Sequence, residues 1–161
     1  MSRRLVMTLT LFFTLAGCNT VVDYPINGVV SLSAHGAGGV EVCATYEHED
    51  DTPTECCSVS TLWRVIDLDA AGRGTDSDRP CGGDPVPVTE LALPDGGKLV
   101  FADSNLSSLD SAGNARWTAP SPFGTLTAAT ANAEDLFIGR GPQVARVSLA
   151  DGNVVWISEL R

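Results

Sequence analysis

Basic residues are scarce in this chain of 161 residues. Ten Lys and Arg stand against 20 Asp and Glu, which gives a formal net charge of −10, and only one of the ten is a lysine, Lys98. A surface of this charge repels phosphate backbones and anionic headgroups. We therefore expect no nucleic-acid binding, and we expect no adhesion to acidic lipid unless another feature supplies it.

Motifs that carry chemistry are also few. His35 and His48 are the two histidines available as a conventional base, and neither lies in a recognisable nucleophile motif. The Gly-rich stretch 33–39 around His35 lacks the strand-to-helix context of a phosphate-binding loop. The sequence therefore predicts no catalytic residue and no cofactor, and an enzyme is the less favoured class.

The N-terminus has the three parts of a secretory signal. Arg3 and Arg4 precede the apolar run Leu5 to Ala16, and small residues then precede a cysteine. The run is shorter than the about 20 apolar residues that a permanent transmembrane helix needs. We therefore expect residues 1–17 to be a signal peptide that takes no part in the fold.

The end of this signal, Leu15-Ala16-Gly17-Cys18, resembles the lipobox of bacterial lipoproteins. The resemblance implies that the Cys18 thiol receives diacylglycerol, that cleavage occurs before it, and that lipid anchors the chain to a membrane. Asn19 is not the Asp that retains some lipoproteins at the inner membrane, so we favour the outer membrane of the cell envelope. An ordinary signal peptidase site and an uncleaved anchor are the alternatives. Without Arg3 and Arg4, eight basic residues face 20 acidic ones, a net charge of −12.

Four cysteines remain after Cys18, namely Cys43, Cys56, Cys57 and Cys81. An even number in an exported protein predicts two disulfides, because that compartment is oxidising. A bond between two neighbouring cysteines is strained, so we expect Cys56 and Cys57 each to pair with Cys43 or Cys81, in an order left open. A zinc site with His35 or His48 is the alternative, but the spacing fits no usual ligand pair, and we predict no metal.

The mature chain is predicted to be all-β. Residues 18–27 read as a lipidated linker, and residues 28–160 contain short runs rich in Val, Leu and Thr between clusters of Gly, Pro, Asp and Asn. No convincing amphipathic helix occurs in this part of the sequence. One β domain of this length is large enough to bury a core.

Two similar segments, about 86–120 and 123–160, suggest an internal repeat. In the second copy, 124–129 and Leu136 to Gly139 are expected strands with a turn at 132–135, and the period is 37 to 39 residues. That is close to one four-stranded propeller blade. Each copy has a glycine, suited to a tight turn, four residues before a tryptophan, and we expect Trp117 and Trp156 to lie flat between adjacent sheets.

Residues 28–80 fit a third, distorted copy. Val29 to Ser33, Val40 to Ala44 and Leu62 to Asp69 are its expected strands, and Gly72 is its turn glycine. Between the second and third strands lies an acidic insertion, roughly Glu47 to Cys57, which we expect to be a long loop tied down by the disulfides.

The segments Leu106 to Trp117 and Ala145 to Trp156 resemble the quinoprotein (PQQ-like) propeller repeat, whose blades end in Leu-Asp-x-x-Gly-x-x-x-Trp. The resemblance implies a partial β-propeller of about three four-stranded antiparallel blades. Closed propellers have four to eight blades, so this chain should leave sheet edges exposed to a protein partner or to a second copy. No set of residues resembles the cofactor and calcium site of the quinoprotein enzymes.

Two acidic segments are further candidates. Asp67 to Asp78 imitates a calcium loop, with acids at positions 1, 3 and 12 and Gly72 at position 6, but it lacks the bidentate Glu at position 12. The run Glu47 to Asp51 could attract a cation or a basic partner, although such runs are usually solvated loops.

The function that best fits these features is a lipid-anchored protein-binding or scaffold module. Its alternative is a truncated relative of a quinoprotein dehydrogenase or propeller lipoprotein that has lost its activity. A third reading is a redox enzyme of quinoprotein descent, which would show cofactor absorbance.

Overall fold

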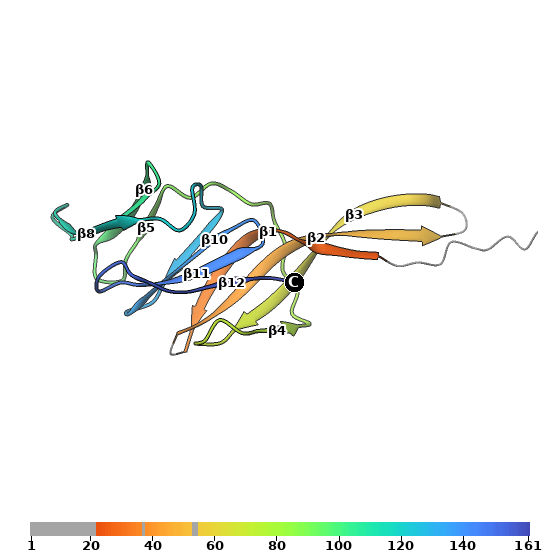
Figure 1. Cartoon of the computed structure of the whole chain (residues 1–161), viewed down its shortest axis with the longest axis horizontal. Helices are drawn as coiled ribbons and strands as arrows, with labels where there is room; N and C mark the ends of the chain where they lie inside the picture. The colour runs from red at the N-terminus through yellow and green to blue at the C-terminus, as the bar shows by residue number, and fades with distance from the viewer. Residues whose placement is uncertain (1–21, 37, 53–54) are drawn as a thin grey trace, which may run out of the picture.

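The computed structural model describes residues 22–36, 38–52 and 55–161, with side chains over 25–36, 38–48 and 59–161. Every regular element in these ranges is a strand, and twelve strands form three antiparallel sheets of four strands each (Figure 1). The predicted all-β class and its division into three four-stranded sheets are confirmed. Over the same ranges, no helix has the length and hydrophobicity needed to cross a membrane.

Sheet I contains the first four strands in sequence order: β1 (Val22–His35), β2 (Gly39–Thr52), β3 (Glu55–Leu68) and β4 (Gly74–Ser77). The three strands expected between residues 29 and 69 correspond to β1, β2 and β3, although β3 ends at Leu68, one residue before the expected end at Asp69. Side chains alternate along β2, so that Val40, Val42 and Ala44 are buried on one face while Cys43 belongs to the other.

Two expectations for this sheet are wrong. Strand β1 begins at Val22, so residues 22–27 are part of the sheet and not of a linker. Within the stretch Glu47 to Cys57, residues 47–52 and 55–57 are strand and not loop, because β2 and β3 stay paired from Val40 and Leu68 out to Thr52 and Glu55. Strand β1 also pairs with β2 as far as Val22 and Glu49, and this end of the sheet projects from the body (Figure 1).

The other two sheets follow in sequence. Sheet II is β5 (Glu90–Ala92), β6 (Lys98–Ala102), β7 (Asn105–Leu109) and β8 (Ala115–Pro120), and sheet III is β9 (Ala128–Ala131), β10 (Asp135–Arg140), β11 (Gln143–Ser148) and β12 (Val154–Glu159). The strand expected at 124–129 starts later, at Ala128. Just before β9, Leu126 instead forms a bridge with Val88, and the Thr127 hydroxyl donates to the Val29 carbonyl at 2.8 Å.

Sheet III lies between the other two sheets. One of its faces places Phe137 and Val144 against sheet I, and the other places Leu136 and Ile138 against sheet II. Strand β10 is therefore buried from Asp135 to Gly139, as its continuous apolar run requires. The spatial order is II, III, I, whereas the order in sequence is I, II, III.

A close approach of two backbones joins sheets III and I. The Val29 amide of β1 donates to the Gly141 carbonyl at 2.9 Å. A Cβ on Gly139 would lie 2.7 Å from Cγ1 of Val29, so only glycine leaves room for β1 at this point. Strand β1 consequently contacts β9 and β10, and the first strands of these two sheets meet.

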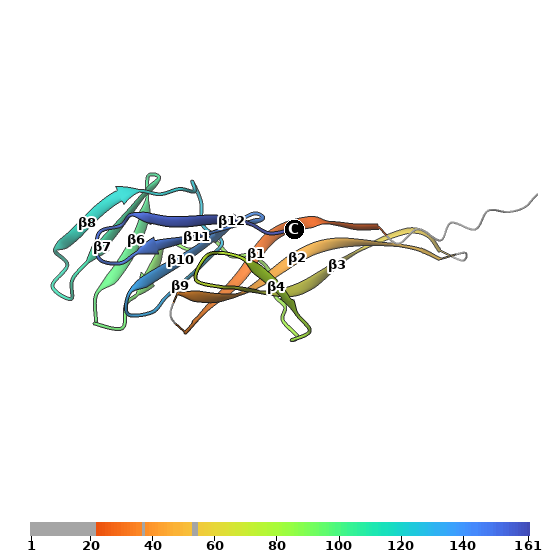
Figure 2. The same cartoon turned by 60° about the horizontal axis from the view of Figure 1, so that its bottom comes forward.

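The connection from sheet I to sheet II is a long extended segment, residues 78–89. It leaves β4, crosses the face of sheet I that carries Cys43 and is turned away from sheet III, and reaches the bridge between Val88 and Leu126 (Figure 1). This path carries the chain past sheet III, which is why the spatial order differs from the sequence order. Figure 2 shows sheet III between the other two sheets.

Candidate functional site

Each sheet has a glycine turn between its third and fourth strands, in segments 69–73, 110–114 and 149–153. The glycines are Gly72, Gly113 and Gly152, with φ of +77°, +85° and +76°. Side chains with a Cβ rarely adopt this backbone conformation, so the glycine at each turn has a physical cause. We call these segments turn I, turn II and turn III.

An aspartate organises each turn. In turns I and II the first residue, Asp69 or Asp110, accepts hydrogen bonds through Oδ1 from the amides two and four residues later, at 2.8–3.0 Å. In turn III, Asp151 accepts from the Asn153 amide at 3.1 Å. These bonds lower the pKa of each carboxyl from 3.8; the largest contributions come, respectively, from the Arg73 amide, the Asn114 side chain and the Asn153 amide. Asp69, Asp110 and Asp151 are called the turn aspartates below.

Two tryptophans pack on the turns of neighbouring sheets. Trp117 of β8 donates from Nε1 to the Leu149 carbonyl at 2.7 Å, and a Cβ on Gly152 would lie 2.6 Å from its ring. Trp156 of β12 donates to the Ala70 carbonyl at 3.0 Å, and a Cβ on Gly72 would lie 2.9 Å from its ring. The expectation that both indoles lie between adjacent sheets is confirmed. Sheet II is thus joined to turn III, and sheet III to turn I.

Turn II has no such partner among the described residues. Gly113 is exposed and a Cβ there would meet no atom within 4 Å, whereas Gly152 is buried and Gly72 is partly buried. Strand β4 could not supply the missing ring, because Asp76 stands four residues after Gly72, where the other two sheets carry tryptophan. The chain therefore has three similar turns, of which two are covered.

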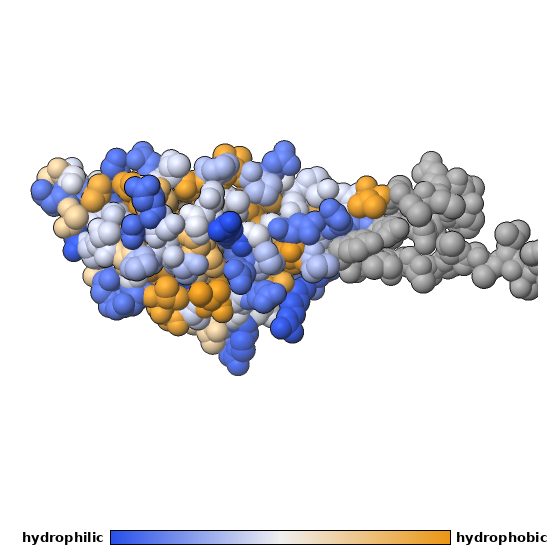
Figure 3. Space-filling view, turned by 45° about the horizontal axis from the view of Figure 1, so that its top comes forward, coloured by the Kyte–Doolittle hydropathy of each residue, from blue (hydrophilic) through white to orange (hydrophobic). Residues whose placement is uncertain are grey.

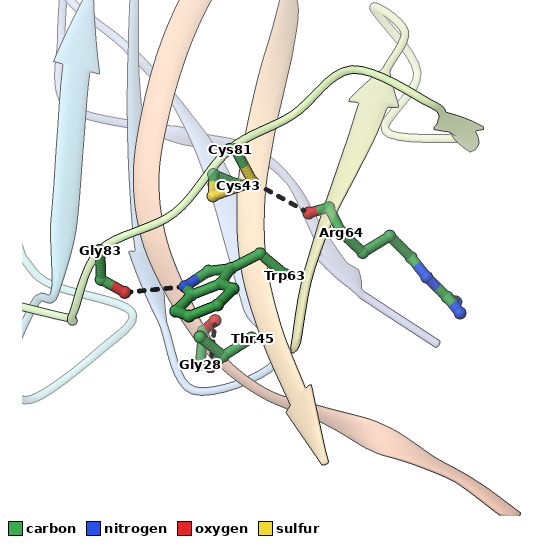
Figure 4. Close-up of a disulfide and its surroundings, with 7 residues drawn as sticks. All are labelled: Gly28, Cys43, Thr45, Trp63, Arg64, Cys81 and Gly83. Carbon is green, nitrogen blue, oxygen red and sulfur yellow. Dashed lines mark hydrogen bonds between the residues drawn. A yellow bond between two sulfur atoms is a disulfide. The ribbon is translucent and has the colours of Figure 1, made fainter. Parts of the chain in front are cut away.

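A disulfide fastens the connecting segment to sheet I. Cys43 of β2 is bonded to Cys81, 38 residues later, and Trp63 of β3 donates from Nε1 to the Gly83 carbonyl at 2.8 Å (Figure 4). The expectation that Cys56 and Cys57 would each pair with Cys43 or Cys81 is wrong. The segment crosses the face of β2 that carries Cys43, which brings Cys81 within bonding range; the side chains of residues 56 and 57 lie outside the described part.

Ion pairs reinforce the same contact. Arg79 binds both carboxylate oxygens of Asp67, at 2.7 and 2.8 Å, and also pairs with Glu41. His35 lies 3.5 Å from Asp67, so this carboxylate already has two partners. The proposed calcium loop does not form, because Asp67 faces Arg79 while Asp69 closes turn I. Among the residues with described side chains, no three His, Cys, Asp or Glu come together to hold a metal ion.

A groove of about 730 Å³ opens between sheets II and III and has the size of a small-molecule pocket. Its two arginines are engaged within the protein, Arg116 with Asp95 and Arg146 with Asp135. Ser108, also in its lining, is buried and its hydroxyl has no hydrogen-bond partner within the described ranges. The Ser108 hydroxyl is thus inaccessible, and both guanidinium groups of the groove already have carboxylate partners within the protein.

Strand β12 forms an edge of sheet III. The strand order places β11 on one side of it and no strand on the other. Val154, Val155 and Ile157 on this strand are exposed by 43%, 51% and 51%. On the face drawn in Figure 3, hydrophobic side chains form separate patches among hydrophilic ones. An apolar edge strand of this kind can pair with another chain.

Some predicted residues are not brought into any site. Cys18 and the rest of the signal lie outside the described residues. The acidic run starting at Glu47 belongs to the projecting part of β2, where Glu47 is exposed and His48 pairs in register with Ser60 of β3.

None of the known family models matches this chain, and no curated protein is similar enough to count as a relative.

Proposed function

We propose that this chain is a lipid-anchored protein-binding scaffold in which the three sheets act as a partial β-propeller. The observation that carries the proposal is the edge strand β12, which combines an unpaired backbone edge with exposed Val155 and Ile157. Natural proteins usually protect such edges with charge, proline or a covering loop. An edge that stays apolar indicates a surface used for pairing.

The mechanism is strand addition. A partner segment in extended conformation pairs its backbone with β12, and alternate apolar side chains give selectivity. Glu159, the last residue of β12, and Arg161 just beyond it are exposed at one end of this edge, and they favour a partner segment with complementary charges there.

The propeller interpretation is supported by the repeated packing. The first strands of sheets III and I meet, their last strands lie at the periphery, and the indoles of β8 and β12 cover the turns of the next sheet. Three sheets are fewer than the four to eight of closed propellers, so the row of sheets does not close and has two ends, at sheets II and I. The segment 78–89 covers one end, the outer face of sheet I.

The membrane anchor is the lipid expected on Cys18. The net charge of the chain opposes binding to an acidic bilayer, so anchoring requires acyl chains, each buried methylene contributing about 0.8 kcal/mol. Confinement to a surface raises the effective concentration of the scaffold near a membrane-bound partner.

The test is capture of a partner from solubilised envelopes by the full lipidated chain. Val155→Lys with Ile157→Lys places two charges on the β12 edge, and Val59→Lys is the matched control, because Val59 is 57% exposed on the projecting hairpin. We expect the wild type and the control to retain the same partner and the double variant to lose it. Equal recovery by all three, or a lone monomer in sedimentation with nothing captured, contradicts the proposal.

A further inference from the structure

Turn II, which no indole covers, has the same structure as turn I, which the Trp156 indole covers. Turns I and II share the pattern Asp-x-x-Gly, and in both the aspartate accepts the amides two and four residues later. The glycine φ values, +77° and +85°, also agree. Turn I is covered by the Trp156 indole, which donates to the Ala70 carbonyl, and Ser111 holds the equivalent position in turn II.

The ring that would cover turn II has a defined origin. In both filled sites the indole comes from the last strand of a neighbouring sheet, four residues after that sheet's own turn glycine. The sheet that carries it also covers the adjoining sheet face. For turn II this is the face of sheet II turned away from sheet III, where Val100 and Leu109 alternate with the core residues Leu99 and Ser108 and stay partly exposed.

A second copy of this chain does not provide such a ring. The sequence has three tryptophans, and Trp117 and Trp156 are both engaged on turns within the chain. Trp63 lies on the third strand of its sheet and donates to the Gly83 carbonyl under the connecting segment. Two copies of the lipidated chain would also repel each other, because without Arg3 and Arg4 each has eight basic residues against 20 acidic ones, a net charge of −12.

We propose that the open face of sheet II and turn II form a docking site for a β-sheet of another protein, which presents a tryptophan on its last strand to Gly113. This inference rests on the proposed function, because it names a class of partner, but it uses a different surface from β12. The partner's indole then covers turn II in the way that Trp156 covers turn I. The partner's sheet packs on sheet II as the next sheet in the row.

A cyclic peptide of residues 143–159 of this chain serves as the probe. It contains Trp156 on its last strand, and joining its ends is compatible with the hairpin because Gln143 and Glu159 are paired in register. Circular dichroism verifies the hairpin, and amide chemical shifts of the full chain report where it binds. We expect saturable binding with shifts at Ser111 and Gly113.

Two changes should each weaken this binding at least about tenfold, the usual loss when a central aromatic contact is removed. One is Trp156→Ala in the peptide. The other is Gly113→Ala in the chain, since a Cβ at the equivalent Gly72 would lie 2.9 Å from the ring. Gly36→Ala is the matched control, because Gly36 also has a positive φ, +57°, and open space around its Cβ position.

Other outcomes overturn the inference. They are an absence of saturable binding, equal binding of Gly113→Ala, or chemical-shift changes confined to β12. The last result would leave the proposed strand addition standing, whereas loss of all capture in the envelope experiment would remove the proposed function. A dimer in sedimentation that Gly113→Ala dissociates would instead identify a second copy as the occupant.

Discussion

Substituting Gly152 by alanine should destabilise the protein much more than the same change at Gly113. Both glycines have similar positive φ values, +76° and +85°. Both substitutions therefore add the strain of placing a Cβ in the left-handed region, about 1–2 kcal/mol. Only at Gly152 does the new Cβ meet Trp117, at 2.6 Å, and Ala119, at 3.0 Å.

The additional cost comes from moving the indole. Displacing Trp117 breaks its hydrogen bond to Leu149, which contributes about 1 kcal/mol. It also exposes a partly buried ring, for which we expect about 2 kcal/mol, less than the about 3–5 kcal/mol of a fully buried aromatic. We therefore expect a loss of about 4–5 kcal/mol for Gly152→Ala and about 1–2 kcal/mol for Gly113→Ala.

Urea denaturation followed by far-UV circular dichroism measures both losses, because this signal does not depend on the perturbed indole. If Gly152→Ala leaves too little folded protein, the Trp117→Ala background supplies the same information. In that background the further change at Gly152 should cost the backbone strain and the tight contact with Ala119, but no longer the displacement of the indole. Equal losses at Gly152 and Gly113, or strict additivity with Trp117→Ala, would refute the packing account.

Three further outcomes follow from the contacts described. Replacing Cys43 and Cys81 by serine should lower the free energy of unfolding by about 2–4 kcal/mol, measured by urea titration without reductant, and an unchanged midpoint would be inconsistent with the bond. Because the pKa of the turn aspartates is lowered from 3.8, their contribution is present above about pH 4 and is lost as the pH falls further; a melting temperature constant down to pH 2 would contradict this. Arg146→Ala leaves the buried carboxylate of Asp135 without its bidentate partner and should lower the free energy of unfolding, measured by urea titration, by about 3–5 kcal/mol. Arg140 is exposed, and Arg140→Ala should change the same quantity by no more than about 0.5 kcal/mol.

The local features of the fold were predictable because their causes are local. A glycine turn followed four residues later by Trp117 or Trp156 marks the last strand of two of the sheets, and the expected strands before Gly72 identified the third. The position of each indole between sheets follows from the same spacing, since a large ring on a last strand is buried only against a neighbouring sheet.

The order of the sheets in space depends on the path of residues 78–89 and was not predicted. One signal was available, because Leu136, Phe137 and Ile138 form a continuous apolar run, which is typical of a strand covered on both faces. Strand β7, by contrast, alternates buried Leu106 and Ser108 with more exposed residues. This difference indicates that sheet III is the central one.

The disulfide and the hairpin failed as predictions for different reasons. Alternation along β2 places Cys43 on the opposite face of the sheet from Val42 and Ala44. Cys81 reaches Cys43 because of the path of the connection between sheets I and II, and no local pattern in the sequence encodes that path. The acidic stretch from Glu47 was interpreted as a loop because of its charge. Its backbone pairs with β3 regardless, since an exposed hairpin tolerates charged side chains.

The proposal that this scaffold works at a membrane surface depends on the thiol of Cys18. Its most direct test compares the full-length chain with Cys18→Ser, following incorporation of radioactive palmitate and the share of protein in the washed membrane fraction. We predict labelled, membrane-bound wild type and an unlabelled variant released into the soluble fraction. Equal labelling and equal membrane association of the two would contradict the account.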